Sequence, residues 1–311
     1  MRHSIETALD AAGLRHRVVS AGLIAEMGRT LAQLRDREIM PAEIYAEYSR
    51  SLACVPPEGM EAVRSLIVVA APSPPLTVAF LLGDRRIEAL LPPTYVSKET
   101  RMLTLEILRG ALGPAGHSVQ KVALPAKLLA VRVGLAEYGL NGLAYIEGLG
   151  SLARLDVYAT GADLLDGGTS AGLDSPERLS VPARMKKCAA CGWCYHACPT
   201  RCISSSGDRI DPLRCLTYLN EHEGEWPSTL DPKTHNSLVG CMVCQLGCPA
   251  NQDVVLPGRL IVTFDREETE IILKDLHEDE LPEGLRKKLD SIDLAEYSTV
   301  LGRNLRALAG A

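Results

Sequence analysis

The sequence predicts an α+β protein built in three consecutive parts. They are a mixed domain over residues 1–180, a cysteine-rich module over residues 181–255 and a tail over residues 256–311 that packs on the core. Helical and extended patterns alternate through the first part, which holds a single cysteine, Cys54. The other nine cysteines lie between Cys188 and Cys248. Mixed helices and strands of this kind favour a partly antiparallel sheet.

The composition is that of a globular chain without a nucleic-acid groove. Its 311 residues are 46% hydrophobic and 23% charged, which excludes a wholly disordered chain, a collagen and a coiled coil. The 33 basic and 39 acidic side chains give a net charge of −6, whereas nucleic-acid grooves usually carry a basic excess. A nucleic-acid partner is therefore not expected.

No membrane segment or secretory signal is predicted. The best apolar stretch, residues 66–82, is interrupted by Pro72, Ser73, Pro74 and Pro75. Residues 1–6 have no apolar core and no twin arginine. We expect a cytoplasmic protein that does not contact a membrane.

The first half of the mixed domain begins with helices and continues with short strands. Helices are predicted at residues 4–12, 24–34 and 42–52, with a strand at residues 16–21 between the first two. Gly13 ends the first helix. Short apolar runs predict strands at residues 65–71, 76–82 and 85–91. Pro72 ends the first of these because proline cannot donate to a sheet ladder, and the Gly83-Asp84 turn indicates a hairpin between the other two.

The second half of this domain contains one long helix and a glycine-rich segment. Ser97 is expected to cap a helix whose Met102, Leu105, Leu108 and Leu112 share one face. A strand at 118–124, a proline-started helix at 125–133 and a strand at 152–159 are predicted to follow the Gly113-Pro114 stop. Residues 161–181 are expected to form a linker, and the acidic stretch 275–283 a solvated face that precedes a helix ending near Leu308.

The cysteine spacing is the most specific feature of the chain. Cys188, Cys191, Cys194 and Cys198 follow the pattern C-x2-C-x2-C-x3-C before Pro199, which is the bacterial ferredoxin run for a [4Fe–4S] cluster. A second run is Cys215, then Cys241, Cys244 and Cys248 before Pro249. Because disulfides are rare in a reducing cytosol, these thiols are interpreted as metal ligands.

The spacing also predicts which cysteines share a cluster. Three cysteines at x2 intervals can reach three corners of one cubane, and the fourth ligates the other cluster in two-cluster proteins. The first cluster is therefore assigned to Cys188, Cys191, Cys194 and Cys248, and the second cluster to Cys198, Cys215, Cys241 and Cys244. Zinc is the weaker alternative, since paired CxxC sites leave the third x2-spaced cysteine and both prolines unexplained. Cys202 is then a plain thiol because both sets are complete.

Three segments resemble one known superfamily. The runs CAACGWCYHACPT, RIDPLRCLTYL and GCMVCQLGCPANQD resemble the double-cluster domain of epoxyqueuosine reductases and reductive dehalogenases. Residues 134–150, GLAEYGLNGLAYIEGLG, resemble the loop and strand that precede this domain, and Gly302-Arg303-Asn304-Leu305 resembles the closing helix. The resemblance covers about residues 90–311.

The resemblance implies a fold, cofactors and partners. The mixed domain would be nitroreductase-like and followed by a bacterial-ferredoxin-like domain with two [4Fe–4S] clusters. A base-off cobalamin would lie in the first domain, with one cluster facing the corrin. An electron donor such as a ferredoxin, a flavodoxin or a reductase is implied, and a corrinoid protein is a further candidate partner.

The resemblance also singles out candidate site residues. Tyr95 lies where the family places a tyrosine beside the cofactor pocket, so it is the candidate catalytic proton donor; a core tyrosine with a bonded hydroxyl is the alternative. Tyr138, Gly139, Asn141 and Gly142 are the candidate cofactor-binding residues, with a tight turn as the alternative.

Departures from the family favour a function in which only electrons move. Val122 and Ala123 stand where epoxyqueuosine reductases carry an acidic proton donor, and neither side chain can donate a proton. Leu140 replaces an expected basic residue. The preferred function is therefore the reductive activation of a corrinoid. An epoxyqueuosine reductase-like or dehalogenase-like enzyme with its own substrate, and an electron-transfer protein without cobalamin, are the alternatives.

Overall fold

The structure is a computed structural model of the whole chain. It describes residues 1–49, 52–60, 62–96, 98–165, 184–207, 210–254 and 259–310. The predicted Ser97 cap and most of the predicted linker lie outside these residues. No helix of the described part is long and apolar enough to cross a membrane.

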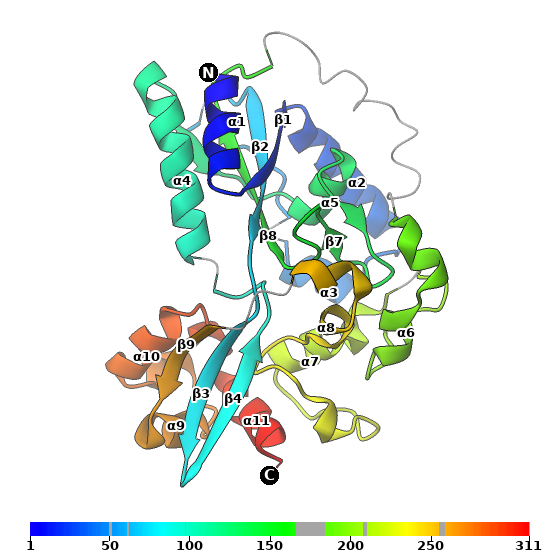
Figure 1. The fold of residues 1–311 in the computed structure, drawn as a ribbon, viewed down its shortest axis with the longest axis vertical. Coiled ribbons are helices and arrows are strands. Elements are labelled where there is room, and N and C mark those ends of the chain that lie inside the picture. Colours follow the sequence, from blue (N-terminus) through cyan, green and yellow to red (C-terminus); the bar gives the residue numbers. More distant parts are fainter. Residues whose placement is uncertain are drawn as a thin grey trace.

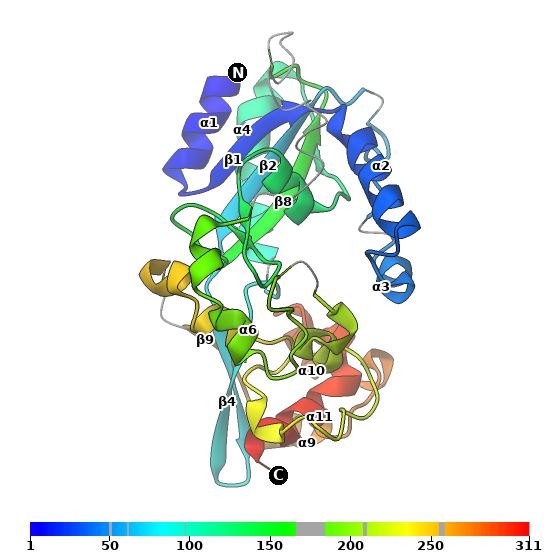
Figure 2. The same cartoon turned by 90° about the vertical axis from the view of Figure 1, so that its right-hand side faces the viewer.

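The larger sheet is antiparallel and has helices on both faces. Its strand order is β1-β2-β8-β5, formed by β1 (Arg15–Ser20), β2 (Ser65–Pro72), β8 (Ala153–Thr160) and β5 (Val119–Lys121). One face packs against α1 (Arg2–Ala11) and α4 (Lys98–Leu112), and the other against α2 (Leu23–Asp36) and α5 (Ala126–Arg132). Figure 2 shows α1 and α2 on opposite sides of this sheet.

The central strand β2 supplies both cores, because side chains alternate across a strand. Leu66 and Val68 point into the core shared with α2 and α5. Ile67 and Val69 point into the core shared with α1 and α4. A strand buried on both faces is a continuous apolar run, which is why the SLIVVAA pattern predicted it correctly.

The smaller sheet joins the hairpin of the first half to the C-terminal tail. Its order is β4-β3-β9, with β3 (Leu76–Leu82) antiparallel to β4 (Arg85–Leu91) and parallel to β9 (Arg259–Phe264). The rings of Phe80 and Phe264 stack with centroids 4.9 Å apart. The helices α9 (Arg266–Ile272), α10 (Glu283–Asp290) and α11 (Ser298–Ala309) complete this core, as Figure 1 shows.

The cysteine module consists of short helices joined by tight turns. They are α6 (Trp193–Ala197), α7 (Leu216–Glu221) and α8 (Val243–Leu246). A two-stranded hairpin of β6 (Glu137–Tyr138) and β7 (Ala144–Tyr145) lies against the module, because Met185 N donates to Tyr138 O. Figure 1 places the module beside the junction of the two sheets, near α3 (Ala42–Glu47).

The predicted α+β class is confirmed, with differences in detail. Met102 was expected on the buried face of α4, but it is 69% exposed. Thr104, Leu108 and Leu112 form that face instead, because Met102 lies about 120° around the helix from Leu108 at 3.6 residues per turn. The helix predicted at 42–52 is shorter, ending at Glu47, and the strand predicted at 118–124 spans only Val119–Lys121.

Candidate iron–sulfur and cofactor site

The predicted ligands of the first cluster come from two loops. Cys188 lies in a 3-10 turn, Cys191 follows it, and Cys194 lies in α6. Gly192 between them has φ +62°, a left-handed conformation that glycine adopts without strain and that turns the chain into α6. Cys248 follows α8, which packs against α6.

Thiols of the two cysteine motifs lie close to one another. Burial raises the pKa of Cys194 to about 11, and the thiols that add to this rise are Cys188 and Cys248. Burial also raises the pKa of Cys241, with Cys215 and Cys198 as contributing thiols. Cys194 in turn contributes to the raised pKa of Cys244, so the contacts run between both sets. The grouping into two interleaved sets stays a prediction.

Polar side chains donate hydrogen bonds to one sulfur of each set. Tyr145 Oη donates to Cys248 Sγ at 3.2 Å. Asn236 Nδ2 donates to Cys241 Sγ at 3.4 Å, while Asn236 Oδ1 accepts from Met242 N at 2.6 Å. Such bonds orient thiolate ligands and stabilise their negative charge. These donors therefore suit the thiolate ligands of iron–sulfur clusters.

The C-terminal helix fixes the segments that carry Cys215 and Cys241. Asn304 of α11 is fully buried, and its Nδ2 donates to Asn220 O and to Leu238 O at 2.8 Å each. Arg303 Nη2 donates to Leu219 O at 2.8 Å. This tail helix therefore holds together the two chain segments that bring second-cluster cysteines into place.

A cavity of about 1230 Å³ lies beside the module. Its walls come from β1, α2, α5 and the two ends of the β6–β7 hairpin. Its apolar lining includes Met27, Leu128, Val131, Leu135 and Ile146, and its charged lining includes Asp10, Arg15, Arg17, Arg132, Glu137 and Glu147. The volume exceeds the roughly 300–1,000 Å³ of typical small-molecule pockets.

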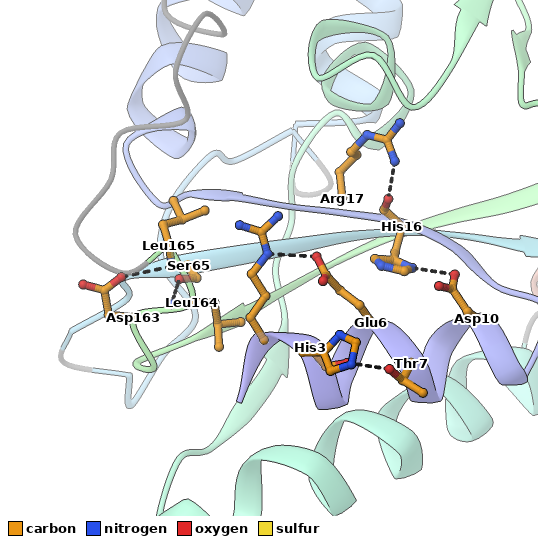
Figure 3. Close-up of polar contacts among 11 residues, drawn as sticks. His3, Glu6, Thr7, Asp10, His16, Arg17, Ser65, Asp163, Leu164 and Leu165 are labelled. Carbon is orange, nitrogen blue, oxygen red and sulfur yellow. Dashed lines mark hydrogen bonds and ion pairs between the residues drawn. The ribbon is translucent and has the colours of Figure 1, made fainter.

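The edge strand β1 gives this cavity a polar rim. Figure 3 shows Arg17 and His16 leaving β1 on opposite faces, with His16 directed at Asp10 of α1. His16 Nδ1 lies 3.6 Å from Asp10 Oδ1, and Arg17 Nη1 donates to His16 O at 2.9 Å. The rim therefore offers groups of both charges to a polar ligand.

Tyr145 connects the cavity to Cys248, a predicted ligand of the first cluster. It lines the cavity, and its hydroxyl is the donor to Cys248. Asn141 Nδ2 donates to Tyr145 Oη at 3.1 Å, and Asn141 Oδ1 accepts from Leu143 N at 3.3 Å. A side chain at Gly139 would overlap the Tyr145 ring, since an added Cβ would lie 2.4 Å from it. The turn thus positions Tyr145, a residue that the sequence interpretation did not select.

The predicted cofactor-binding residues lie behind Tyr145 and are not among the residues that line the cavity. Asn141 positions Tyr145, and Tyr138 O holds the cysteine module through Met185 N. Gly142 has φ +68°, and a Cβ there would lie 2.4 Å from Ile210 of the module. The tight-turn alternative describes this arrangement, and direct cofactor contact by these four residues stays a prediction.

Tyr95, the predicted catalytic residue, lies in the core of the smaller sheet. It is 6% exposed, its hydroxyl donates to the Glu221 carboxylate, and its ring meets Tyr297 edge-on at 5.6 Å. Burial raises the pKa of Tyr95 well above its usual value. Tyr95 is not among the residues that line the cavity. The core-tyrosine alternative describes this placement, and a catalytic role stays a prediction.

Val122 and Trp193 have clear structural surroundings. Val122 is 3% exposed in the core between the larger sheet and α5, so it presents no proton donor to the cavity. The Trp193 ring covers the Gly247 backbone, where an added Cβ would lie 2.3 Å from it, and the ring is 47% exposed. Trp193 therefore shields the peptide group that precedes Cys248 from solvent.

Comparisons with known proteins agree with this picture. Residues 187–251 match the 4Fe-4S double cluster binding domain family. An epoxyqueuosine reductase of Alicycliphilus denitrificans is 33% identical over 146 residues, covering 46% of this chain and 36% of the relative. One from Lactococcus garvieae is 30% identical over 132 residues, covering 42% and 33%. The matched segments thus span about a third of these relatives.

Solved structures share the fold over nearly the whole chain. The epoxyqueuosine reductase of Streptococcus thermophilus has a TM-score of 0.60 at 16% identity, covering 99% of this chain and 80% of that one. The Bacillus subtilis enzyme has a TM-score of 0.60 at 17% identity, covering 97% and 80%. The fold and the cysteine module define a double-cluster iron–sulfur protein. The resemblance to epoxyqueuosine reductases predicted from the sequence is confirmed.

The Tyr145 hydrogen bond should set the potential of the first cluster. In Tyr145→Phe the sulfur of Cys248 loses its donor, so the first cluster should become harder to reduce. A hydrogen bond to a charged group is worth enough to change the oxidised-to-reduced ratio about tenfold, or ~59 mV for one electron. Potentiometric titration followed by EPR measures this. Tyr138→Phe, in the same hairpin, is the control; equal potentials in Tyr145→Phe and the parent protein would exclude the role.

Glu221 should make stability fall between acidic and neutral pH. Burial raises its pKa from 4.5 to about 7. The folded state therefore binds more protons than the unfolded state in this window, and the contribution is lost as pH rises through about 7. Replacing Glu221 by Gln should flatten the decline in Tm between pH 5 and 8, measured by circular dichroism. An unchanged slope in Glu221→Gln would show that another group carries it.

Proposed function

We propose that the chain is an iron–sulfur oxidoreductase that passes low-potential electrons through two [4Fe–4S] clusters to a corrinoid held in the 1230 Å³ cavity. The observation that carries this proposal is the double role of Tyr145. The same side chain lines the cavity and donates to Cys248, a predicted ligand of the first cluster. An electron on that cluster is therefore separated from the cavity by one aromatic residue.

The cavity suits a corrinoid in size and in chemistry. A corrinoid is an apolar macrocycle surrounded by amide side chains, so its site needs apolar walls and a polar rim. Leu128, Val131 and Leu135 supply the walls, and Arg15 and Glu137 belong to the charged groups of the lining. When bound, the corrinoid would supply a metal centre that accepts one electron at a time.

Residues of the chain keep the cavity open and shaped. Arg132 of α5 pairs with Glu26 of α2 at 2.6 Å, with side chains only 5% and 17% exposed. Because breaking a buried pair leaves an uncompensated charge, this contact holds the two helical walls at a fixed separation. Arg15 Nε donates to Glu147 O at 3.5 Å and joins β1 to the opposite wall.

The electron route begins at a partner and ends at the cavity. The second cluster, built on Cys215, Cys241 and Cys244, would receive electrons from a ferredoxin, a flavodoxin or a reductase. The interleaved cysteines Cys198 and Cys248 link the two sets, so the first cluster would deliver electrons past Tyr145. The buried Val122 offers no proton, which favours reductive activation of the corrinoid, a reaction that moves only electrons.

The sequence relatives favour a second candidate, reduction of a substrate of the chain's own. Several relatives are epoxyqueuosine reductases, and a reduction of that kind consumes protons as well as electrons. Asp10, Glu137 and Glu147 are carboxyl groups among the cavity-lining residues. Turnover of epoxyqueuosine-containing tRNA would establish this candidate in place of corrinoid activation.

The test of the proposal is anaerobic reconstitution followed by titration with hydroxocobalamin. We expect about eight irons per chain, as two [4Fe–4S] clusters require, and a change in the visible and EPR spectra that saturates. Eight irons without a cobalamin response would leave an electron-transfer protein that serves a separate partner. Zinc in place of iron would contradict the whole proposal.

A pair of neighbouring variants assigns cobalamin binding to the cavity. Thr30 of α2 lines it, whereas Arg29 is exposed and is not among its lining residues. Thr30→Trp should narrow the cavity and weaken cobalamin binding at least about tenfold, because the indole ring occupies part of the ligand's volume. Arg29→Trp should bind like the parent protein, and both variants should keep their iron. Equal binding by the two variants would place the corrinoid elsewhere.

A further inference from the structure

A ninth cysteine of the module lies against the second cluster's ligands. Cys202 is 6% exposed, and its Sγ lies 3.5 Å from Cys198 Sγ. Cys215 packs against the same small cluster, which Leu140, Cys202 and Ile203 form. Both neighbours belong to the predicted second set, so Cys202 lies at one corner of that cluster without being needed to complete it.

The surrounding backbone holds Cys202 in this position. Arg201 before it has φ +51°, an uncommon left-handed conformation for a long side chain, and this turn directs Cys202 back toward the ligands. Cys202 O accepts from Asp211 N at 2.8 Å, and Ile203 pairs with Ile210. Leu140 and Ile203 pack around the thiol. The position of the sulfur is therefore set by the fold.

The chemistry of the three sulfurs gives them different roles. Ligand cysteines are thiolates and carry no proton, so they can only accept hydrogen bonds. A cysteine outside the ligand set keeps its S–H, which is a weak donor. In Cys202 this proton can be directed at Cys198 Sγ, 3.5 Å away. Hydrogen bonds to cluster sulfurs are one of the factors that set a cluster's reduction potential.

We infer that Cys202 is a potential-setting residue of the second cluster, acting through S–H donation to Cys198. Donation stabilises the more negative, reduced cluster and so raises its potential. Asn236 also donates to Cys241, so the second cluster would have two such donors. This inference rests on the cluster part of the proposed function and is independent of the corrinoid.

The test compares two substitutions at this position with a control at the other non-ligand cysteine. Cys202→Ala removes the donor, Cys202→Ser keeps a donor on a shorter reach, and Cys54→Ala changes a thiol in the core of the larger sheet. Each protein is reconstituted, its iron is counted, and its clusters are titrated potentiometrically by EPR. Tyr145→Phe, which alters the first cluster, identifies which reduction step belongs to which cluster.

We expect Cys202→Ala to keep about eight irons and to need a lower potential for the second cluster only. At a fixed potential its oxidised-to-reduced ratio should rise about tenfold, equivalent to ~59 mV for one electron. Cys202→Ser should lie between Cys202→Ala and the parent protein, and Cys54→Ala should match the parent. An exchangeable proton coupled to the second cluster in deuterium-exchange ENDOR should be lost in Cys202→Ala.

Two results would overturn the inference. Loss of iron in Cys202→Ala, with full iron in Cys54→Ala, would make Cys202 a ligand. Full iron with an unchanged potential and an unchanged proton coupling would make it packing alone. Failure of the clusters to assemble in the parent protein would instead contradict the proposed function, so the two failures are distinguishable.

Discussion

The hydrogen bond from Tyr145 to Cys248 is the contact on which the functional arrangement depends. Tyr145 belongs to the mixed domain and Cys248 to the cysteine module, so one bond joins the cavity of the first to a cluster ligand of the second. The position of the tyrosine ring is fixed by the hydrogen bond from Asn141 and by close packing against Gly139. A tyrosine suits this position, because its ring forms part of an apolar wall while its hydroxyl donates a hydrogen bond to the sulfur.

The module itself is held by elements far away in the sequence. It has little regular structure of its own, and its loops are fixed at the second cluster by Asn304 and Arg303 of the last helix. That helix packs on the β3–β4 hairpin of the first half, which in turn pairs with β9. The last helix, supported by this hairpin, therefore holds the second-cluster loops. Buried amide side chains are suited to this task because each hydrogen bond they make fixes a backbone segment.

Much of the architecture could be predicted from local patterns, and the long-range pairings could not. The strands β2, β3 and β4 follow from apolar runs, proline stops and the Gly83-Asp84 turn. The parallel pairing of β9 with β3 joins residues nearly two hundred positions apart, and no local signal specifies such a partner. The prediction for Met102 was wrong because four apolar residues at roughly helical spacing were all assigned to the buried face. The angle around the helix that these residues cover is wider than that face.

The candidate site shows the same division. The spacing of the cysteines is specific for iron–sulfur ligation, so the sequence alone predicts how the ligands are grouped. Tyr145 and Cys202 carry no such pattern. Tyr145 is one aromatic residue in an apolar run and Cys202 is the ninth cysteine of the module, and only the sulfurs beside them reveal a role. Tyr95 is the opposite case. Its sequence motif predicted a catalytic role, but its surroundings are those of a core residue whose hydroxyl is bonded to Glu221.

The central claim is that the first cluster and the cavity are neighbours. The most direct measurement is the magnetic interaction between the reduced first cluster and a Co(II) corrinoid bound to the reconstituted protein, observed by EPR. The account predicts that reducing the cluster splits or broadens the cobalt signal, and that Thr30→Trp weakens the effect in step with the loss of corrinoid binding. A cobalt signal from bound corrinoid that is unchanged by cluster reduction would contradict the account.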